Sequence, residues 1–194
     1  MTRWVPARIA IVVAFVISIV GPVAPVAAEQ IDFDKATIAQ LNAAFDAGTL
    51  TAEKLVEMCL ERIKAFDRDG PKLHAVISLN PNALEIARAL DEERKAKGPR
   101  SPLHGIPVIF KDNIDTVDMP TTGGSVLLEG SMAPDDAFLV KQLRAGGAII
   151  LAKVNLGEFA NGSQSSMGGQ SLNPHDLTRT PAGSSGGTGV GIAA

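Results

Sequence analysis

Lys111 is the first residue of this sequence whose type and position suggest chemistry. It directly follows Val108-Ile109-Phe110, an apolar run rich in β-branched residues that is typical of a buried strand. An ammonium at the end of such a strand lies beside apolar surface, and desolvation lowers the pKa of a lysine because it disfavours the charged form. A neutral lysine can act as a general base. A lysine that extends its charged end to solvent is the alternative, and Lys153, which follows the apolar run Ala148–Ala152 in the same way, shows that this pattern alone does not decide.

A second feature is the glycine- and serine-rich segment Gly183–Gly189. A Walker A loop would need Lys and Ser or Thr after its last glycine, but Val190 follows there. A dinucleotide fingerprint would need a preceding apolar strand, but Thr180, Pro181 and Ala182 precede it. Both phosphate-binding interpretations fail, which leaves a glycine-rich turn with a serine N-cap leading into a helix.

The histidines and the cysteine indicate no further chemistry. His74, His104 and His175 are scattered, without a pair at the spacing that grips a metal, and no G-x-S-x-G elbow supports a Ser-His-Asp triad. Each histidine is therefore predicted to be structural. The one cysteine, Cys59, excludes an internal disulfide and lies in an apolar helical stripe, so it is predicted to be a small core residue.

The elements that would position these residues follow from hydrophobic periodicity. Three helices are predicted, over residues 36–47, 51–66 and 81–96, with Gly48 ending the first and Thr51 capping the second. A strand over residues 105–110, a helix over 135–145 and a strand over 148–152 form a βαβ unit, which predicts a layered α/β fold. Pro107 suggests that the first of these strands begins at an edge or a bulge.

The first 28 residues have a different composition. Arg3 and Arg8 precede an uncharged apolar run, Ile9–Val20, and Val26-Ala27-Ala28 offers the small-x-small pattern of a cleavage site. The run is short for a membrane span, which needs about 20 residues. A signal peptide over residues 1–28 is therefore predicted, with export to the periplasm or the medium. A retained N-terminal anchor, with membrane association, is the alternative.

Overall composition fits a globular protein. The 194 residues carry a formal net charge of −3, with 45% hydrophobic and 20% charged residues, so nothing suggests binding to nucleic acid.

Several ordered motifs together resemble one known family. Residues 103–113, Leu-His-Gly-Ile-Pro-Val-Ile-Phe-Lys-Asp-Asn, are similar to the lysine motif of the amidase signature family. Thr121-Thr122-Gly123-Gly124-Ser125 resembles its following loop. Further matches in order and spacing cover residues 134–155, Glu158-Phe159-Ala160 and residues 173–187, so that the similarity extends over residues 31–194.

The resemblance implies a Ser-Ser-Lys triad. Lys111 matches the catalytic lysine and Ser184 the bridging serine, whose peptide bond is cis in the family. Ser185, Gly183 and Gly186 match supporting positions. The family needs no metal or organic cofactor and hydrolyses a carboxamide through an acyl-enzyme. Its nucleophilic serine lies in a Gly-Gly-Ser segment about twenty residues beyond the bridging serine, and the chain ends before such a segment. Ala182 also replaces a glycine that is common in the family.

The expected fold is the amidase-signature α/β fold, a mixed central sheet covered by helices on both sides, here truncated to its N-terminal part over residues 29–194. The expected partner is a small-molecule or peptide amide, and a homodimer is left open. The signal sequence argues against the cytoplasmic tRNA-linked amidotransferases of the family. The chain alone is expected to be inactive. If residues 1–194 are instead the complete product, a non-catalytic binding module or a degenerate pseudoenzyme is the alternative.

Overall fold

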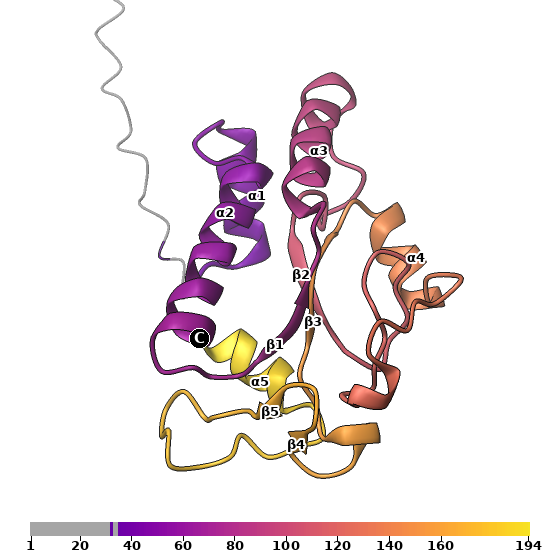
Figure 1. Cartoon of the computed structure of the whole chain (residues 1–194). Helices are drawn as coiled ribbons and strands as arrows, with labels where there is room; N and C mark the ends of the chain where they lie inside the picture. Colours follow the sequence, from indigo (N-terminus) through magenta and orange to yellow (C-terminus); the bar gives the residue numbers. More distant parts are fainter. Residues whose placement is uncertain (1–31, 33–34) are drawn as a thin grey trace, which may run out of the picture. The chain divides into compact units, whose positions relative to one another are not determined.

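The computed structural model describes residue 32 and residues 35–194 (Figure 1). The predicted signal peptide, residues 1–28, lies outside the described residues. Within the described part of the chain, no helix is both long and apolar enough to cross a membrane.

A three-stranded mixed sheet forms the centre of residues 35–194. It consists of β1 (Val76–Leu79), β2 (Pro107–Lys111) and β3 (Ile149–Val154) in the order β1-β3-β2. The central strand β3 is buried along its whole length, pairs antiparallel with β1 and pairs parallel with β2. The predicted βαβ unit is thereby confirmed, whereas β1 is a strand that the sequence did not predict.

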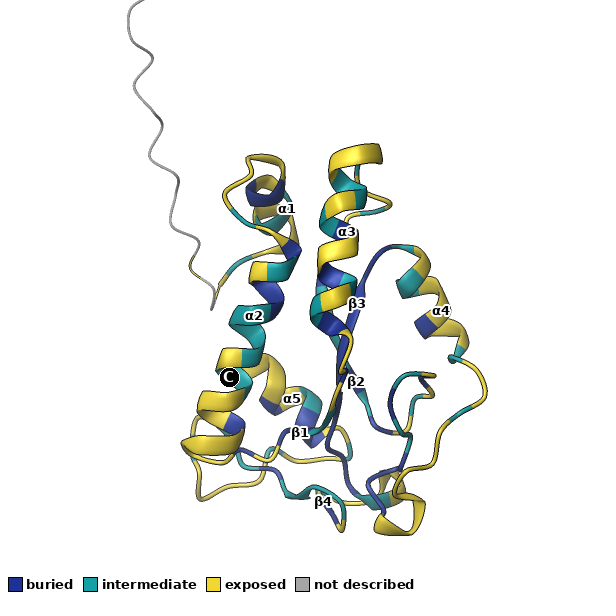
Figure 2. Cartoon of the chain, turned by 45° about the horizontal axis from the view of Figure 1, so that its top comes forward, coloured by how far each residue is buried: buried dark blue, intermediate teal, exposed yellow. Residues whose placement is uncertain are grey.

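Helices cover both faces of this sheet, as predicted (Figures 1 and 2). The α-helices are α1 (Ile38–Asp46), α2 (Ala52–Arg62), α3 (Ala83–Lys97), α4 (Phe138–Ala145) and α5 (Gly186–Ala193). One apolar core joins α2, α3 and α5 to the sheet, and a second joins α4 to the other face. Shorter elements are the π-helix η1 (Ile63–Asp69), the 3₁₀ turns η2 (Val126–Leu128) and η3 (Glu158–Ala160), and a hairpin of β4 (Gln164–Ser165) and β5 (Gly169–Gln170).

Thr51 caps α2 as predicted, whereas α1, predicted from residue 36, begins at Ile38 after the cap Thr37. Thr37 and Gln40 form a reciprocal capping box on α1, and the Thr51 hydroxyl accepts a hydrogen bond from the Lys54 amide at the start of α2. Asp91 of α3 adds a second cap, because its two carboxylate oxygens accept from the amides of Ala52 and Glu53.

Two predicted helices differ from the structure by more than two residues at one end. The second helix is predicted to continue to residue 66, but it changes to a π-helix at Ile63, and Phe66 is exposed rather than on the apolar face. The helix predicted to begin at Asp135 begins at Phe138. The Asp136 carboxylate accepts hydrogen bonds from the Val117 amide and from Arg144, and these contacts hold it in the preceding loop.

A bulge in β3 decides which side chains share a face of the sheet. Val108 is paired with Ile150 and Ile109 with Ala152, so Leu151 is an extra residue in β3. Alternation then places Lys153 on the face of its partner Phe110, and Lys111 on the opposite face with Val154. The prediction that each lysine follows its strand is wrong, since Lys111 is the last residue of β2, and Lys153 lies within β3 and is fully buried.

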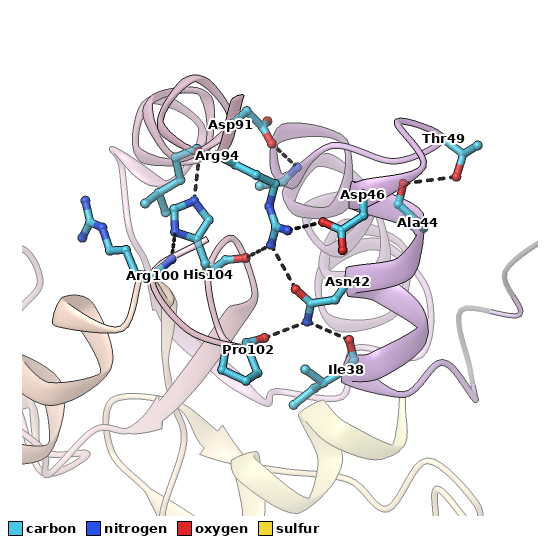
Figure 3. A network of polar contacts seen from close by, with 12 residues as sticks. Ile38, Asn42, Ala44, Asp46, Thr49, Asp91, Arg94, Arg100, Pro102 and His104 are labelled. Carbon is cyan, nitrogen blue, oxygen red and sulfur yellow. Dashed lines mark hydrogen bonds and ion pairs between the residues drawn. The ribbon is translucent and has the colours of Figure 1, made fainter. Parts of the chain in front are cut away.

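A polar network joins α1, α3 and the loop before β2 (Figure 3). The Arg94 guanidinium lies 4.9 Å from the Phe45 ring centroid and donates to Asp46, Asn42 and the His104 carbonyl. The buried His104 ring accepts from the Arg100 amide, and its other nitrogen lies 2.8 Å from the Leu90 carbonyl oxygen. This histidine is structural, as predicted, and the network fixes the chain that enters β2.

Candidate active site

Lys111 and Ser184, 73 residues apart in sequence, meet beside the end of β2. The Lys111 Nζ and the Ser184 Oγ are hydrogen bonded at 2.6 Å, and both residues are half-buried. The peptide bond between Gly183 and Ser184 is cis, which is what the family resemblance implied. An amine and a hydroxyl at this distance can exchange a proton directly.

The segment that carries Ser184 is attached to the chain that follows β3. The Ser184 carbonyl accepts a hydrogen bond of 2.9 Å from the Gly157 amide. Three residues later, the Gly187 amide donates to the Asn155 carbonyl, also at 2.9 Å. These two bonds fix the segment at Ser184 and just beyond it, so β3 positions the serine while β2 positions the lysine.

Two glycines permit this close approach. A Cβ on Gly183 would lie 2.0 Å from the Gly162 carbonyl oxygen, and a Cβ on Gly187 would lie 2.5 Å from the amide nitrogen and the carbonyl oxygen of Asn155. Neither space holds even a methyl group. The glycine-rich composition is therefore a packing requirement for bringing Ser184 to Lys111.

Asn155 is the buried centre of the surrounding hydrogen bonds. Its Nδ2 donates to the carbonyls of His74 and Gly169 and to the Ser171 hydroxyl, while its Oδ1 accepts from the Ser165 hydroxyl. The side chain thus ties the segment before β1 and the β4–β5 hairpin, with the residue that follows it, to the end of β3. Sequence reasoning did not single out Asn155, and the signal available was its position directly after a buried strand.

The other predicted site residues are close to Ser184 in sequence but are not hydrogen bonded to the Lys111 ammonium. Ser185 is exposed, occupies the N-cap position of α5 without a side-chain cap, and its hydroxyl makes no hydrogen bond to a described residue. Gly186 is buried in the first turn of α5. The supporting role of Ser185 stays a prediction.

The two lysines that sequence alone could not separate have different surroundings. Within the described residues, no carboxylate lies within ion-pairing distance of Lys111, whose ammonium contacts the Ser184 hydroxyl. The Lys153 ammonium lies 3.2 Å from the Asp112 carboxylate, and both side chains are completely buried. Burial lowers the pKa of Lys153, and the Asp112 charge opposes this effect.

Other reactive groups do not contribute to this site. Over residue 32 and residues 35–194, no three His, Cys, Asp or Glu side chains are arranged to hold a metal ion. Burial raises the pKa of the half-buried Cys59 thiol to about 11, so it is not a reactive thiolate at neutral pH. A cavity of about 730 Å³ between α1, α2, β2 and α5 is lined by neither Lys111 nor Ser184.

Comparisons with known proteins agree on one family. The family described as Amidase matches residues 54–194. A glutamyl-tRNA(Gln) amidotransferase subunit from Streptomyces coelicolor is 42% identical over 166 residues, which cover 84% of this chain and 33% of that protein. The chain thus spans about a third of the length of the curated relatives it matches.

Solved structures show the same relationship. The native peptide amidase from Stenotrophomonas maltophilia matches with 45% identity and a TM-score of 0.78, over 80% of this chain and 33% of that one. An amidase family protein from Bacillus anthracis matches with 41% identity and a TM-score of 0.76, over 79% of this chain and 32% of that one. The mixed sheet and its helical layers are therefore those of the amidase-signature fold.

Proposed function

Since this chain belongs to the Amidase family, we propose that it supplies the base and the proton relay of a carboxamide hydrolase. Lys111 is the base, Ser184 is the relay, and the attacking serine lies outside residues 1–194. Residues 1–194 alone are then inactive. The single observation that carries the proposal is the 2.6 Å hydrogen bond between Lys111 and Ser184.

The chemistry follows from the two groups in contact. Neutral Lys111 takes a proton from the Ser184 hydroxyl, and Ser184 takes one from the attacking serine, whose oxygen forms a bond to the amide carbon. The C–N bond breaks as the lysine returns its proton, through Ser184, to the leaving nitrogen. Water then adds to the acyl-enzyme by the same relay and releases the carboxylic acid.

The proposed substrate is a small-molecule or peptide carboxamide. The structural relative from Stenotrophomonas maltophilia is a peptide amidase. Both Lys111 and Ser184 lie within residues 54–194, the part of the chain that matches the Amidase family. The likeness therefore includes the two groups that would move the proton, and it supports an amide as the bond that is cleaved.

The natural protein, purified in full length from its source, tests this function. We expect it to release ammonia from amidated dipeptides or simple primary amides, and to transfer the acyl group to hydroxylamine, which traps an acyl-enzyme. Ammonia release measured by a coupled assay, together with hydroxamate formation, checks both steps. Binding of these amides without turnover would instead support a binding module or a pseudoenzyme.

We further propose that the protein is exported and that residues 1–28 are removed. The support is the sequence pattern of a basic start, the apolar run Ile9–Val20 and the small residues before Glu29. N-terminal sequencing of the natural protein is expected to begin at Glu29, in the fraction outside the cytoplasm. A protein that keeps Met1 to Ala28 and sediments with membranes would contradict cleavage and support the anchored form.

A further inference from the structure

A completely buried ion pair, formed by Asp112 and Lys153, lies on the face of the sheet opposite the side chain of the candidate base Lys111. One oxygen of Asp112 faces the Lys153 ammonium at 3.2 Å, and the other accepts hydrogen bonds from the hydroxyl and the amide of Thr122. Lys153 also donates to the Pro120 carbonyl at 3.1 Å and to the Thr121 hydroxyl at 3.0 Å. The pair thus fixes the loop after β2 as well as the two strands.

The pair is coupled to Lys111 through the backbone on both sides. Asp112 is the next residue along the chain, and its amide donates to the carbonyl of Val154, the strand partner of Lys111. Lys153 is the residue before Val154. Because of the bulge at Leu151, the pair occupies the sheet face opposite the Lys111 side chain, so it determines where that side chain starts without competing for Ser184.

Stability alone is a poor reason for this pair. Removing two charges from water costs several kcal/mol for each ion, and well-packed apolar side chains of similar volume often stabilise a core as well or better. A charged pair at this place therefore needs another explanation. Its position beside a lysine that must lose its proton supplies one.

We propose that the Asp112–Lys153 pair is a positioning device for Lys111, in which Lys153 also neutralises the carboxylate next to the base. The inference rests on the proposed function, because it assigns a role relative to the reacting amine. Without Lys153, the Asp112 charge would favour protonated Lys111. Without Asp112, the Lys153 charge would favour neutral Lys111.

Two further carboxylates, Asp115 and Asp118, act on the charge of Lys153. Both lie in the loop after β2 and favour the charged form of Lys153. Asp118 is paired at 2.8 Å with Arg144 of α4, which in turn bonds Asp136. On the Lys111 side, the group in contact is the uncharged Ser184 hydroxyl. Asp112 and Lys153 are therefore the two charges beside the base that can be removed one at a time or both together.

The test is the pH dependence of kcat in the full-length natural protein. Neighbouring residues on a strand hold charges on the order of 10 Å apart, where one unit charge moves an ionisation by about one pH unit. If Lys111 is the base, kcat should rise with increasing pH. Lys153→Met should therefore move the midpoint of that rise about one unit to higher pH, and Asp112→Asn should move it to lower pH.

The double variant Asp112→Asn/Lys153→Met, which removes both charges, should return the midpoint towards that of the wild type. Lys95→Met is the matched control, because it removes an exposed lysine charge from α3, and its midpoint should not move. The midpoint is expected to shift in opposite directions in the two single variants, so whichever of them folds is enough to test the proposal. A lower kcat with an unchanged midpoint in the single variants, or an equal shift in the double variant, would overturn the proposal.

Failure of the proposed function gives a different result. If the wild-type protein hydrolyses amides and Lys111→Ala abolishes this activity, the function stands whatever the pair does. Unmoved midpoints in the variants of the pair then reject the positioning device alone.

Discussion

Replacing Lys111 by alanine should lower kcat for amide hydrolysis by the full-length natural protein about 10⁴-fold, with a much smaller effect on KM. The amine is the end of the proton relay, and a positioned general base contributes up to about 10⁴ in rate. Lys111 contacts the Ser184 hydroxyl, so its loss removes an interaction that matters in the transition state rather than in substrate binding. Steady-state kinetics with a primary amide measures both constants.

The variant Lys111→Arg tests whether the site uses the basicity of Lys111 or only its positive charge. Arginine keeps a positive charge but does not lose its proton in proteins, so it cannot act as a base. We expect it to be as inactive as the alanine variant. Lys141→Ala, which removes an exposed lysine that pairs with Asp135, is the control and should retain wild-type rates. Substantial activity of Lys111→Arg would mean that the charge of the lysine, and not its basicity, is what the site uses.

Gly187→Ala should lower the free energy of unfolding by about 3 kcal/mol, because a Cβ there would overlap backbone atoms that cannot move away. The added carbon would lie 2.5 Å from the amide nitrogen and the carbonyl oxygen of Asn155 and 2.6 Å from the Ala75 carbonyl oxygen. Denaturant unfolding, followed by circular dichroism, measures the loss.

Gly189→Ala is the matched control on the same helix. Gly189 is exposed, and a Cβ on it would meet nothing within 4 Å. Alanine is the better helix former, so this variant should gain roughly 0.5 kcal/mol. Equal losses in both variants would mean that α5 does not depend on close contact with the end of β3, and that the glycines of this segment are not a packing requirement.

The sequence predicted the sheet and its flanking helices where periodicity is long and simple. The βαβ unit and the helices on both faces were predicted correctly, because β2, α4 and β3 each have one clear apolar pattern. Strand β1 was missed because its four residues, Val76–Leu79, are too few to show a period. The π-helical turn after Arg62 was missed because the apolar residues of the helix continue past Arg62. The sequence pattern does not show that the backbone hydrogen bonds there span one more residue than in an α-helix.

The candidate site could be predicted only in part. The meeting of Lys111 with Ser184 followed from a family resemblance, since nothing local relates residues 73 positions apart. Local pattern also could not distinguish Lys111 from Lys153. The difference depends on the bulge at Leu151 and on the buried partner Asp112, which are tertiary features that no window of sequence reveals.

The bulge at Leu151 also constrains how this region can change in evolution. Deleting that one residue would remove the bulge and leave Ile150 opposite Val108 and Lys153 opposite Phe110 in a regular ladder, so both would keep their present faces of the sheet. A change that shifted the residues after the bulge by one position against β2 would instead move Lys153 to the face of the Lys111 side chain and away from Asp112. Position 151 should therefore accept other apolar residues or be absent among homologous sequences, whereas changes of length that shift Lys153 against Phe110 should be selected against.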